Sequence, residues 1–246
     1  MNSKPQNGKA YLLTGVFAAT LLTSAMGASA FSGPGFSESA VLVPKSALLE
    51  PQDSDTQLET TVLAGGCFWG MQAVFQHVKG VRSAVSGYSG GVVDTAQYER
   101  VSSGTTGHAE AVQITFDPKI VNYGTILRIY FSVAHDPTQL NRQGPDTGTQ
   151  YRSAIFPESD EQKEVAEAYI QQLGNSGAFK KPLVTNVETG KIFYQAEAYH
   201  QDYATLHPDN GYVATFEVPK VEALSLLFPE LYSPKPVLVG STTSPS

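Results

Sequence analysis

The chain has 246 residues and a net charge of −7, from 16 lysine and arginine residues against 23 aspartate and glutamate residues. This acidic balance, with no basic run, argues against nucleic acid or an anionic membrane surface as a partner. The hydrophobic content of 41% fits one globular domain with tails, and the single cysteine excludes an intramolecular disulfide.

The N-terminus has the pattern of a secretory signal. Two lysines precede an apolar run over residues 10–26, and the small residues Ala28-Ser29-Ala30 follow. We predict cleavage near Ala30 and export, to a periplasm or the cell exterior. The run approaches the roughly 18 to 20 residues that span a bilayer, so a membrane anchor over residues 10–26 is the alternative. A transit peptide fits less well, because the segment has no arginine.

The rest of the chain divides by composition. Residues 31–57 are rich in Ser, Pro and Gly without a hydrophobic period and predict a flexible linker, and residues 233–246 predict a flexible tail. We expect residues 58–232 to form one compact unit that carries the chemistry. An unpaired cysteine in an exported protein is either buried or reactive.

The compact unit begins with a strand, a glycine corner and a helix. Residues 60–64 (TTVLA) predict a buried strand, and apolar residues spaced three and four apart from Phe68 to Val78 predict a helix that ends near Gly80. Cys67 then lies in the first helical turn, where free N–H groups favour the reactive thiolate. The alternative is a core cysteine that acts as a small hydrophobe.

The later elements follow in order, separated by two long irregular stretches at 87–107 and 135–150. Glu110 lies at the entrance of a strand whose Val112, Ile114 and Phe116 alternate with polar residues. Ser159 and Gln162 predict a capping box for a helix that ends at Gly174. We also expect strands at 81–86, 151–156, 183–188 and 191–195, the last two paired around Thr189-Gly190, and helices at 122–134 and 196–206.

This order predicts an α+β two-layer sandwich, with a mixed sheet, helices on one side and a ferredoxin-like core. A doubly wound parallel fold is the alternative. Polar residues of the two irregular stretches could converge on the cysteine: Tyr98, Glu110, and Asp146 with Tyr151. The five histidines show no metal-ligand spacing and no glycine motif cradles phosphate, so no bound cofactor or metal is expected.

Five segments together resemble the A type of peptide methionine sulfoxide reductase. They are GGCFWG, GYSGG, TGHAEAV, HDPTQLNRQGPDTGTQYRSAIF and AEAYHQDY, and they span nearly all of the compact unit in the right order. The resemblance implies a peptide-methionine (S)-S-oxide reductase that repairs oxidised proteins and reduces free methionine sulfoxide. It acts with a thiol reductant and without nucleic acid, and we expect a monomer.

The resemblance also implies residue roles. Cys67 would be the nucleophile, and Glu110 would protonate or hydrogen-bond the sulfoxide oxygen. Tyr98 and Tyr151 would be further donors, and Asp146 would orient this polar set. Phe68 and Trp69 would form the apolar wall for the S-methyl group.

These roles agree with the chemistry of sulfoxides. The sulfur becomes electrophilic only when its oxygen is protonated or strongly hydrogen-bonded, so Glu110 must be neutral, which requires a raised pKa. Attack by Cys67 leaves methionine and a cysteine sulfenic acid. A pocket with donors on one side and Trp69 on the other distinguishes the two sulfur epimers, because the wrong one leaves donors unpaired.

One departure from the family concerns recycling. Many relatives carry resolving cysteines in the C-terminal tail, and this tail has none, so an external thiol must attack Cys67: thioredoxin, glutaredoxin or a small thiol. Two rival functions remain open. An acyl-transfer hydrolase would pair Cys67 with His108, His135 or His200 and need no reductant. A non-catalytic module would bind methionine-rich surfaces without oxygen loss.

Overall fold

The computed structural model describes residues 1, 30–31, 40–48 and 58–239. Within these ranges no helix is long and apolar enough to cross a membrane. The predicted signal or anchor over residues 10–26 lies outside the described residues, so both alternatives for it remain predictions.

A six-stranded mixed sheet forms the centre of the molecule, with strand order β10-β4-β5-β3-β8-β9. All neighbouring pairs are antiparallel except β8 with β9. The strands of this sheet are β3 (Glu59–Gly65), β4 (Val81–Ser89), β5 (Ala109–Phe116), β8 (Ser153–Phe156), β9 (Asn186–Val187) and β10 (Phe193–Gln195). Two small pairs lie outside it: β1 (Ala30–Phe31) with β2 (Ala40–Val41), and β6 (Arg142–Gln143) with β7 (Asp146–Thr147).

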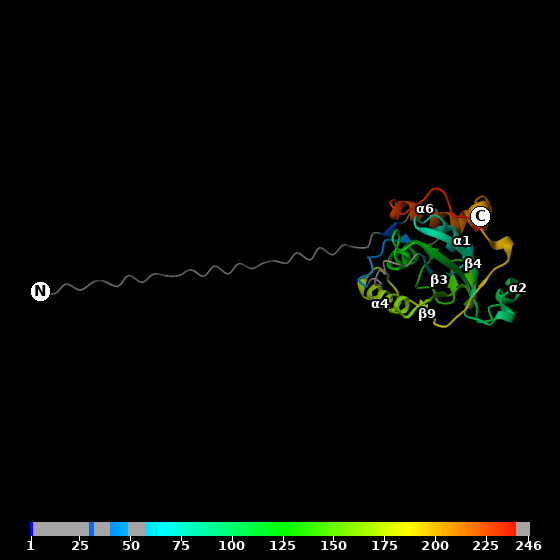
Figure 1. Ribbon diagram of the computed structural model, residues 1–246, viewed down its shortest axis with the longest axis horizontal. Helices are drawn as coiled ribbons and strands as arrows, with labels where there is room; N and C mark the ends of the chain where they lie inside the picture. Colours follow the sequence, from blue (N-terminus) through cyan, green and yellow to red (C-terminus); the bar gives the residue numbers. More distant parts are fainter. Residues whose placement is uncertain (2–29, 32–39, 49–57, 240–246) are drawn as a thin grey trace.

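The helical segments connect these strands (Figure 1). The α-helices are α1 (Phe68–Gln76), α2 (Tyr98–Val101), α3 (Tyr123–Ile129), α4 (Asp160–Ser176), α5 (Tyr203–Leu206) and α6 (Val218–Leu227). The 3₁₀-helices are η1 (Val93–Thr95), η3 (Thr149–Tyr151) and η4 (Ala198–His200), and the π-helices are η2 (Tyr130–Ala134) and η5 (Val213–Glu217).

The predicted fold class is confirmed. The order β3-α1-β4-β5-α3-β8 is a βαββαβ unit whose antiparallel strands stand as β4-β5-β3-β8, the ferredoxin-like arrangement. The main core fills the space between one face of the sheet and helices α1, α3, α4 and α6. In β3, Leu63 belongs to this core, while its neighbours Val62 and Ala64 belong to a smaller cluster on the opposite face.

Three predicted details of the elements are wrong. The segments at 183–188 and 191–195 do not form a hairpin, because β9 pairs with β8 and β10 pairs with β4, at opposite edges of the sheet. Helix α4 ends at Ser176, since the left-handed residue after it is Gly177 and not Gly174. The predicted helix at 196–206 is two short pieces, interrupted by Asp202 with φ of 60°.

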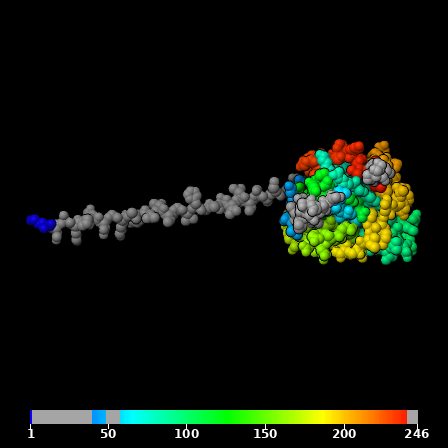
Figure 2. Space-filling model, in the orientation of Figure 1, coloured from blue at the N-terminus to red at the C-terminus, as the bar shows by residue number. Residues whose placement is uncertain are grey.

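The expected linker and tail are partly packed against the domain. Val43 is fully buried, its N–H donates to Ser132 Oγ, and the Tyr169 hydroxyl donates to the carbonyl of Pro44. In Figure 2 residues 40–48, in blue, lie on the surface beside the yellow-green α4. At the other end, Val237 donates to the carbonyl of Gln76. Residues 40–48 and 233–239 are therefore part of the fold, because their backbone groups find partners in it. Residues 49–57 and 240–246 lie outside the described part.

Candidate active site

Cys67 lies at a tight corner between β3 and α1. Gly66 has φ of +94°, and a Cβ there would lie 2.6 Å from Gln143 Cβ, so only glycine fits. Cys67 is the N-cap residue of α1, one position before the helical turn in which the sequence placed it. The side chain keeps partial exposure, so the corner presents the sulfur at the edge of the core.

The expected low pKa of this thiol is wrong. Burial raises the pKa of Cys67 well above its ordinary value, and the nearby carboxyl groups of Glu217 and Glu110 raise it further. The N–H of Trp69 at the helix start and the Lys220 ammonium lower it, but they are weaker. In the resting protein Cys67 is therefore a thiol, because desolvation and two acidic neighbours outweigh the helix N-terminus.

Glu110 meets the requirement for a neutral acid. The side chain is 3% exposed, and its Oε2 accepts a 3.0 Å hydrogen bond from the N–H of Phe68, the residue after Cys67. Burial raises the pKa of Glu110 to about 8, while the Phe68 bond opposes the shift and the charge of Asp146 adds to it. At neutral pH most of the Glu110 carboxyl is protonated and able to donate a hydrogen bond.

Tyr98 and Tyr151 lie near enough to Cys67, Glu110 and Asp146 for the charges of these three residues to act on both phenols. Tyr98 begins α2, Tyr151 ends η3, and Asp146 begins β7. Burial raises the pKa of Tyr151, and the charges of Glu110, Asp146 and Cys67 raise it further. Burial and the charge of Glu110 likewise raise the pKa of Tyr98. Both phenols are therefore protonated donors facing the Cys67 region.

The two aromatic residues after Cys67 differ in position. Phe68 is 1% exposed and packs below the corner against Tyr88 and His200, with centroid distances of 5.8 and 5.0 Å. Trp69 is only partly buried; it stacks on Tyr203 at 4.0 Å and donates from Nε1 to His200 Nδ1 at 3.2 Å. Trp69 is therefore the more accessible part of the predicted apolar wall.

Sequence reasoning missed four residues of the site. Tyr212 donates a short hydrogen bond to Asp146 Oδ2, and Glu197 accepts from the N–H of Tyr98 at 3.0 Å, which positions α2. Glu217 and Lys220 form an ion pair of 2.9 Å. The segment AEAYHQDY marked the region of Glu197, but no local pattern connects Tyr212, Glu217 or Lys220 with a cysteine some 150 positions earlier.

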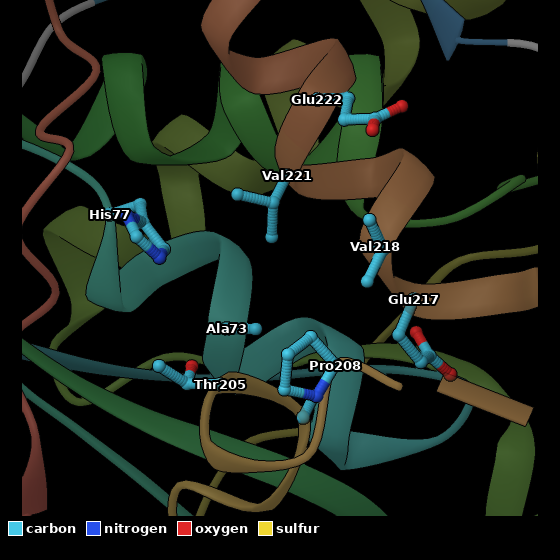
Figure 3. Close-up of a pocket in the computed structure, with 9 residues that line it drawn as sticks. Ala73, His77, Thr205, Pro208, Glu217, Val218, Val221 and Glu222 are labelled. Atoms are coloured by element: carbon cyan, nitrogen blue, oxygen red, sulfur yellow. The ribbon is translucent and has the colours of Figure 1, made fainter. Parts of the chain in front are cut away.

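A small cleft brings Cys67 together with three of the missed residues, Tyr212, Glu217 and Lys220. Its volume is about 10 Å³, close to the minimum for one water molecule. Asp146 lies on its wall, and the full lining is Cys67, Gln143, Pro145, Asp146, Tyr212, Phe216, Glu217 and Lys220. A larger apolar cavity of about 160 Å³ contains none of the predicted site residues; it lies between α1, α5 and α6, and Glu217 borders it as well (Figure 3).

The histidines do not form a Cys-His pair. The ring nitrogens of His108 contact the backbone of Gly91 and Val92, those of His135 contact Tyr130 and Ser153, and Nδ1 of His200 accepts from Trp69. Burial lowers the pKa of all three. Among the described residues no group of three His, Cys, Asp or Glu side chains could hold a metal ion. The geometry favours the carboxyl and phenol groups as the partners of Cys67.

Comparisons with known proteins agree with this arrangement. A family model described as peptide methionine sulfoxide reductase matches residues 59–227. The chain is 60% identical over 186 residues to the peptide methionine sulfoxide reductase MsrA 2 of Mesorhizobium japonicum, covering 76% of this chain and 95% of the relative. It is 51% identical over 177 residues to MsrA 2 of Synechocystis, covering 72% and 81%.

Two solved structures are similar as well. Reduced Mxr1 from Saccharomyces cerevisiae has a TM-score of 0.55 at 31% identity, covering 67% of this chain and 94% of that one. Methionine sulfoxide reductase A of Corynebacterium diphtheriae has a TM-score of 0.52 at 31% identity, covering 68% and 83%.

Proposed function

Because the chain belongs to the peptide methionine sulfoxide reductase family, we propose that it reduces the S epimer of methionine sulfoxide, in proteins and free, to methionine. Cys67 is the nucleophile and Glu110 the acid. The observation that carries this proposal is the buried Glu110, whose pKa of about 8 keeps it protonated beside the only cysteine of the chain.

The first half-reaction needs a donor on oxygen and a nucleophile on sulfur. Because Oε2 of Glu110 accepts from Phe68, the acid proton is carried on Oε1 and donated to the sulfoxide oxygen. The hydroxyls of Tyr98 and Tyr151 add two further donors. Each such donor in a water-poor site contributes about 3 kcal/mol to transition-state stabilisation. Asp146, which accepts from Tyr212, keeps the wall of the cleft in place.

Discrimination between epimers follows from the two sides of the site. The methyl group lies against Trp69, the oxygen meets the three donors, and the remainder of the substrate extends to solvent. Exchanging methyl and oxygen would put a polar atom against the indole and leave the buried donors unpaired, which costs about 1 to 3 kcal/mol for each one. Phe68 supports this wall from below, through its contact with His200.

The test is reduction of N-acetylmethionine S-sulfoxide by the purified protein with dithiothreitol, followed by chromatography. We expect N-acetylmethionine as the product from the wild type and none from Cys67→Ser. The R epimer should be converted at least about tenfold more slowly, since 1.4 kcal/mol corresponds to a factor of ten. Equal conversion by Cys67→Ser, or hydrolysis of a thioester without reductant, would contradict the proposal.

Recycling follows from the single cysteine. After one turnover Cys67 is a sulfenic acid, an external thiol attacks it with loss of water, and a second thiol releases Cys67 from the mixed disulfide. Without reductant, one equivalent of sulfoxide should therefore give a stable sulfenic acid that dimedone labels at Cys67. If methionine forms and no labelled protein appears, this route is wrong. Comparing turnover with thioredoxin, glutaredoxin and small thiols identifies the reductant.

The compartment is a separate proposal. The lysines, the apolar run and Ala28-Ser29-Ala30 support export with cleavage near Ala30. An anchored protein with the same catalytic domain remains the alternative. N-terminal sequencing of the protein from fractionated cells distinguishes them, because an exported protein begins after Ala30 and an anchored one retains residues 10–26.

A further inference from the structure

Glu217 reaches the catalytic cysteine from the far end of the chain. It ends η5, directly before α6, and its side chain is 1% exposed. The carboxylate lies against Gly70, in the first turn of the helix that Cys67 caps. A Cβ at position 70 would lie 1.5 Å from Glu217 Oε2, so a larger residue there would displace the carboxylate. The last glycine of GGCFWG thus makes room for a buried acid.

Two positive groups lie beside the side chain of Glu217. Lys220 Nζ lies 2.9 Å from Oε2, and the first turn of α1 presents the positive end of the helix. Among the described residues, Oε2 nevertheless has no aligned hydrogen-bond donor, so the contact with Lys220 is an ion pair only. A buried carboxylate oxygen without an aligned donor has lone pairs free to accept a hydrogen bond from a group or a water in the cleft.

Glu217 and Cys67 line the same cleft, whose 10 Å³ accommodate about one water. Of the charged groups facing the thiol, Glu217 has the strongest influence on it, ahead of Glu110 and Lys220. The other acids have different partners: Glu110 is mostly protonated, and Asp146 accepts from the Tyr212 hydroxyl. Tyr98, Tyr151 and Tyr212 are protonated phenols and cannot accept the proton.

We propose that Glu217, held by Lys220 and seated on Gly70, is the general base that removes the proton of Cys67 during attack on the sulfoxide, directly or through one water. This rests on the proposed function. The Cys67 sulfur bonds to the substrate sulfur, Glu217 takes the thiol proton, and Glu110 gives its proton to the sulfoxide oxygen. The oxygen then passes to Cys67 as sulfenic acid, so the sulfoxide is reduced by two electrons and the thiol is oxidised by two.

The test compares two reactions of Cys67 in Glu217→Gln. The first is alkylation of the free enzyme by iodoacetamide at pH 8, which needs only the thiolate. The second is methionine formation in a single turnover without reductant. Glu222→Gln is the matched control: it removes an exposed carboxylate of α6 at another edge of the neighbouring cavity (Figure 3). Both rates should be unchanged in this control.

We expect the alkylation rate and the single-turnover rate of Glu217→Gln to respond differently. Alkylation should be as fast as in the wild type or faster, because a negative charge near the thiol is removed. The single turnover should be about 100-fold slower, the usual contribution of a general base. An unchanged or faster single turnover would show that Glu217 affects Cys67 only through its charge, and would overturn the proposal. A parallel slowing of both reactions would also overturn it, since that indicates a distorted site.

A second variant guards against misfolding. Glu217→Gln leaves Lys220 without its buried counter-ion, whereas Glu217→Gln with Lys220→Met removes both charges, which buried ion pairs often tolerate. The same 100-fold loss with preserved alkylation is expected, and normal turnover would overturn the inference. If the wild type forms no methionine at all, the proposed function has failed instead, so the two failures are distinguishable.

Discussion

The most direct prediction concerns the pH dependence of the first half-reaction. Burial gives Glu110 a pKa of about 8, and only its neutral form donates to the sulfoxide. At pH 7 about nine tenths of the molecules therefore carry the active acid, and at pH 9 about one tenth do. The second-order rate constant for methionine formation should fall about tenfold over this interval. The pKa of the Cys67 thiol is raised well above its ordinary value, so ionisation of this thiol does not mask the decrease in the rate constant.

Glu110→Gln should remove this pH dependence. Glutamine keeps a carbonyl oxygen for the N–H of Phe68 but never ionises, and its amide transfers no proton. At pH 7 we expect a rate about 10²- to 10³-fold lower, as for loss of one donor to a developing oxyanion. Between pH 7 and 9 the rate of the variant should be flat.

Rapid-quench single turnovers at subsaturating sulfoxide provide the measurement, because the second-order rate constant reports groups of the free enzyme. Glu99→Gln, which removes an exposed carboxylate of α2, is the control and should keep the wild-type profile. A decrease with the same midpoint near pH 8 in Glu110→Gln would assign the titration to another group and refute the reasoning. So would a wild-type rate that does not decrease up to pH 9.5.

Three further predictions concern stability in urea denaturation. As pH rises from 4.5 to 8, Glu110 ionises in the unfolded state but stays mostly neutral in the folded state. The wild type should therefore lose up to about 5 kcal/mol of unfolding free energy over this range, and Glu110→Gln should not. Equal losses in the two proteins would contradict the raised pKa. Gly70→Ala should lower the unfolding free energy by about 1 to 3 kcal/mol, because the added Cβ meets Glu217. Gly174→Ala, which has open space around it in α4, should raise the unfolding free energy by up to about 1 kcal/mol. Equal effects would show that Gly70 is not needed to accommodate Glu217. Val43→Ala should cost about 2 kcal/mol, and a loss below about 0.5 kcal/mol would mean that residues 40–48 do not stabilise the domain.

The sequence was sufficient for the elements whose signals are local. The strand–glycine–helix corner at Cys67, the alternation in β5 and the cap at Ser159 each depend on contacts within a few residues, and each is observed. The Thr189-Gly190 pair carries the same local signal as a hairpin turn. Its flanking segments instead pair with β8 and β4, because the two edges of the sheet offer unpaired strands and local pattern cannot choose between partners.

The candidate site also has features that the sequence could predict and features that it could not. Glu110, Tyr98, Asp146 and Tyr151 belong to segments that resemble the family, so their convergence on Cys67 could be predicted. The thiol's protonation could not, because it depends on the charge of a residue 150 positions away and on burial. A helix N-terminus favours a thiolate by a modest amount, and desolvation acts in the opposite direction with larger effect. Cys67 lies at the predicted corner, but its pKa is shifted in the direction opposite to the prediction.

The protonated thiol gives the site a chemical advantage. The same desolvation that raises the pKa of Glu110 also raises the pKa of Cys67. Because oxidants and alkylating agents react with the thiolate, we expect the resting site to react slowly with them. Cys67 can attack a bound sulfoxide only if a nearby group accepts the thiol proton while the sulfoxide oxygen receives the proton of Glu110. A site with one acid and no base would need solvent for that transfer, and the cleft beside Cys67 holds about one water. Under the proposed mechanism, selectivity for sulfoxide over general oxidation depends on a second carboxyl group beside Cys67, and Glu217 lines the cleft with this residue.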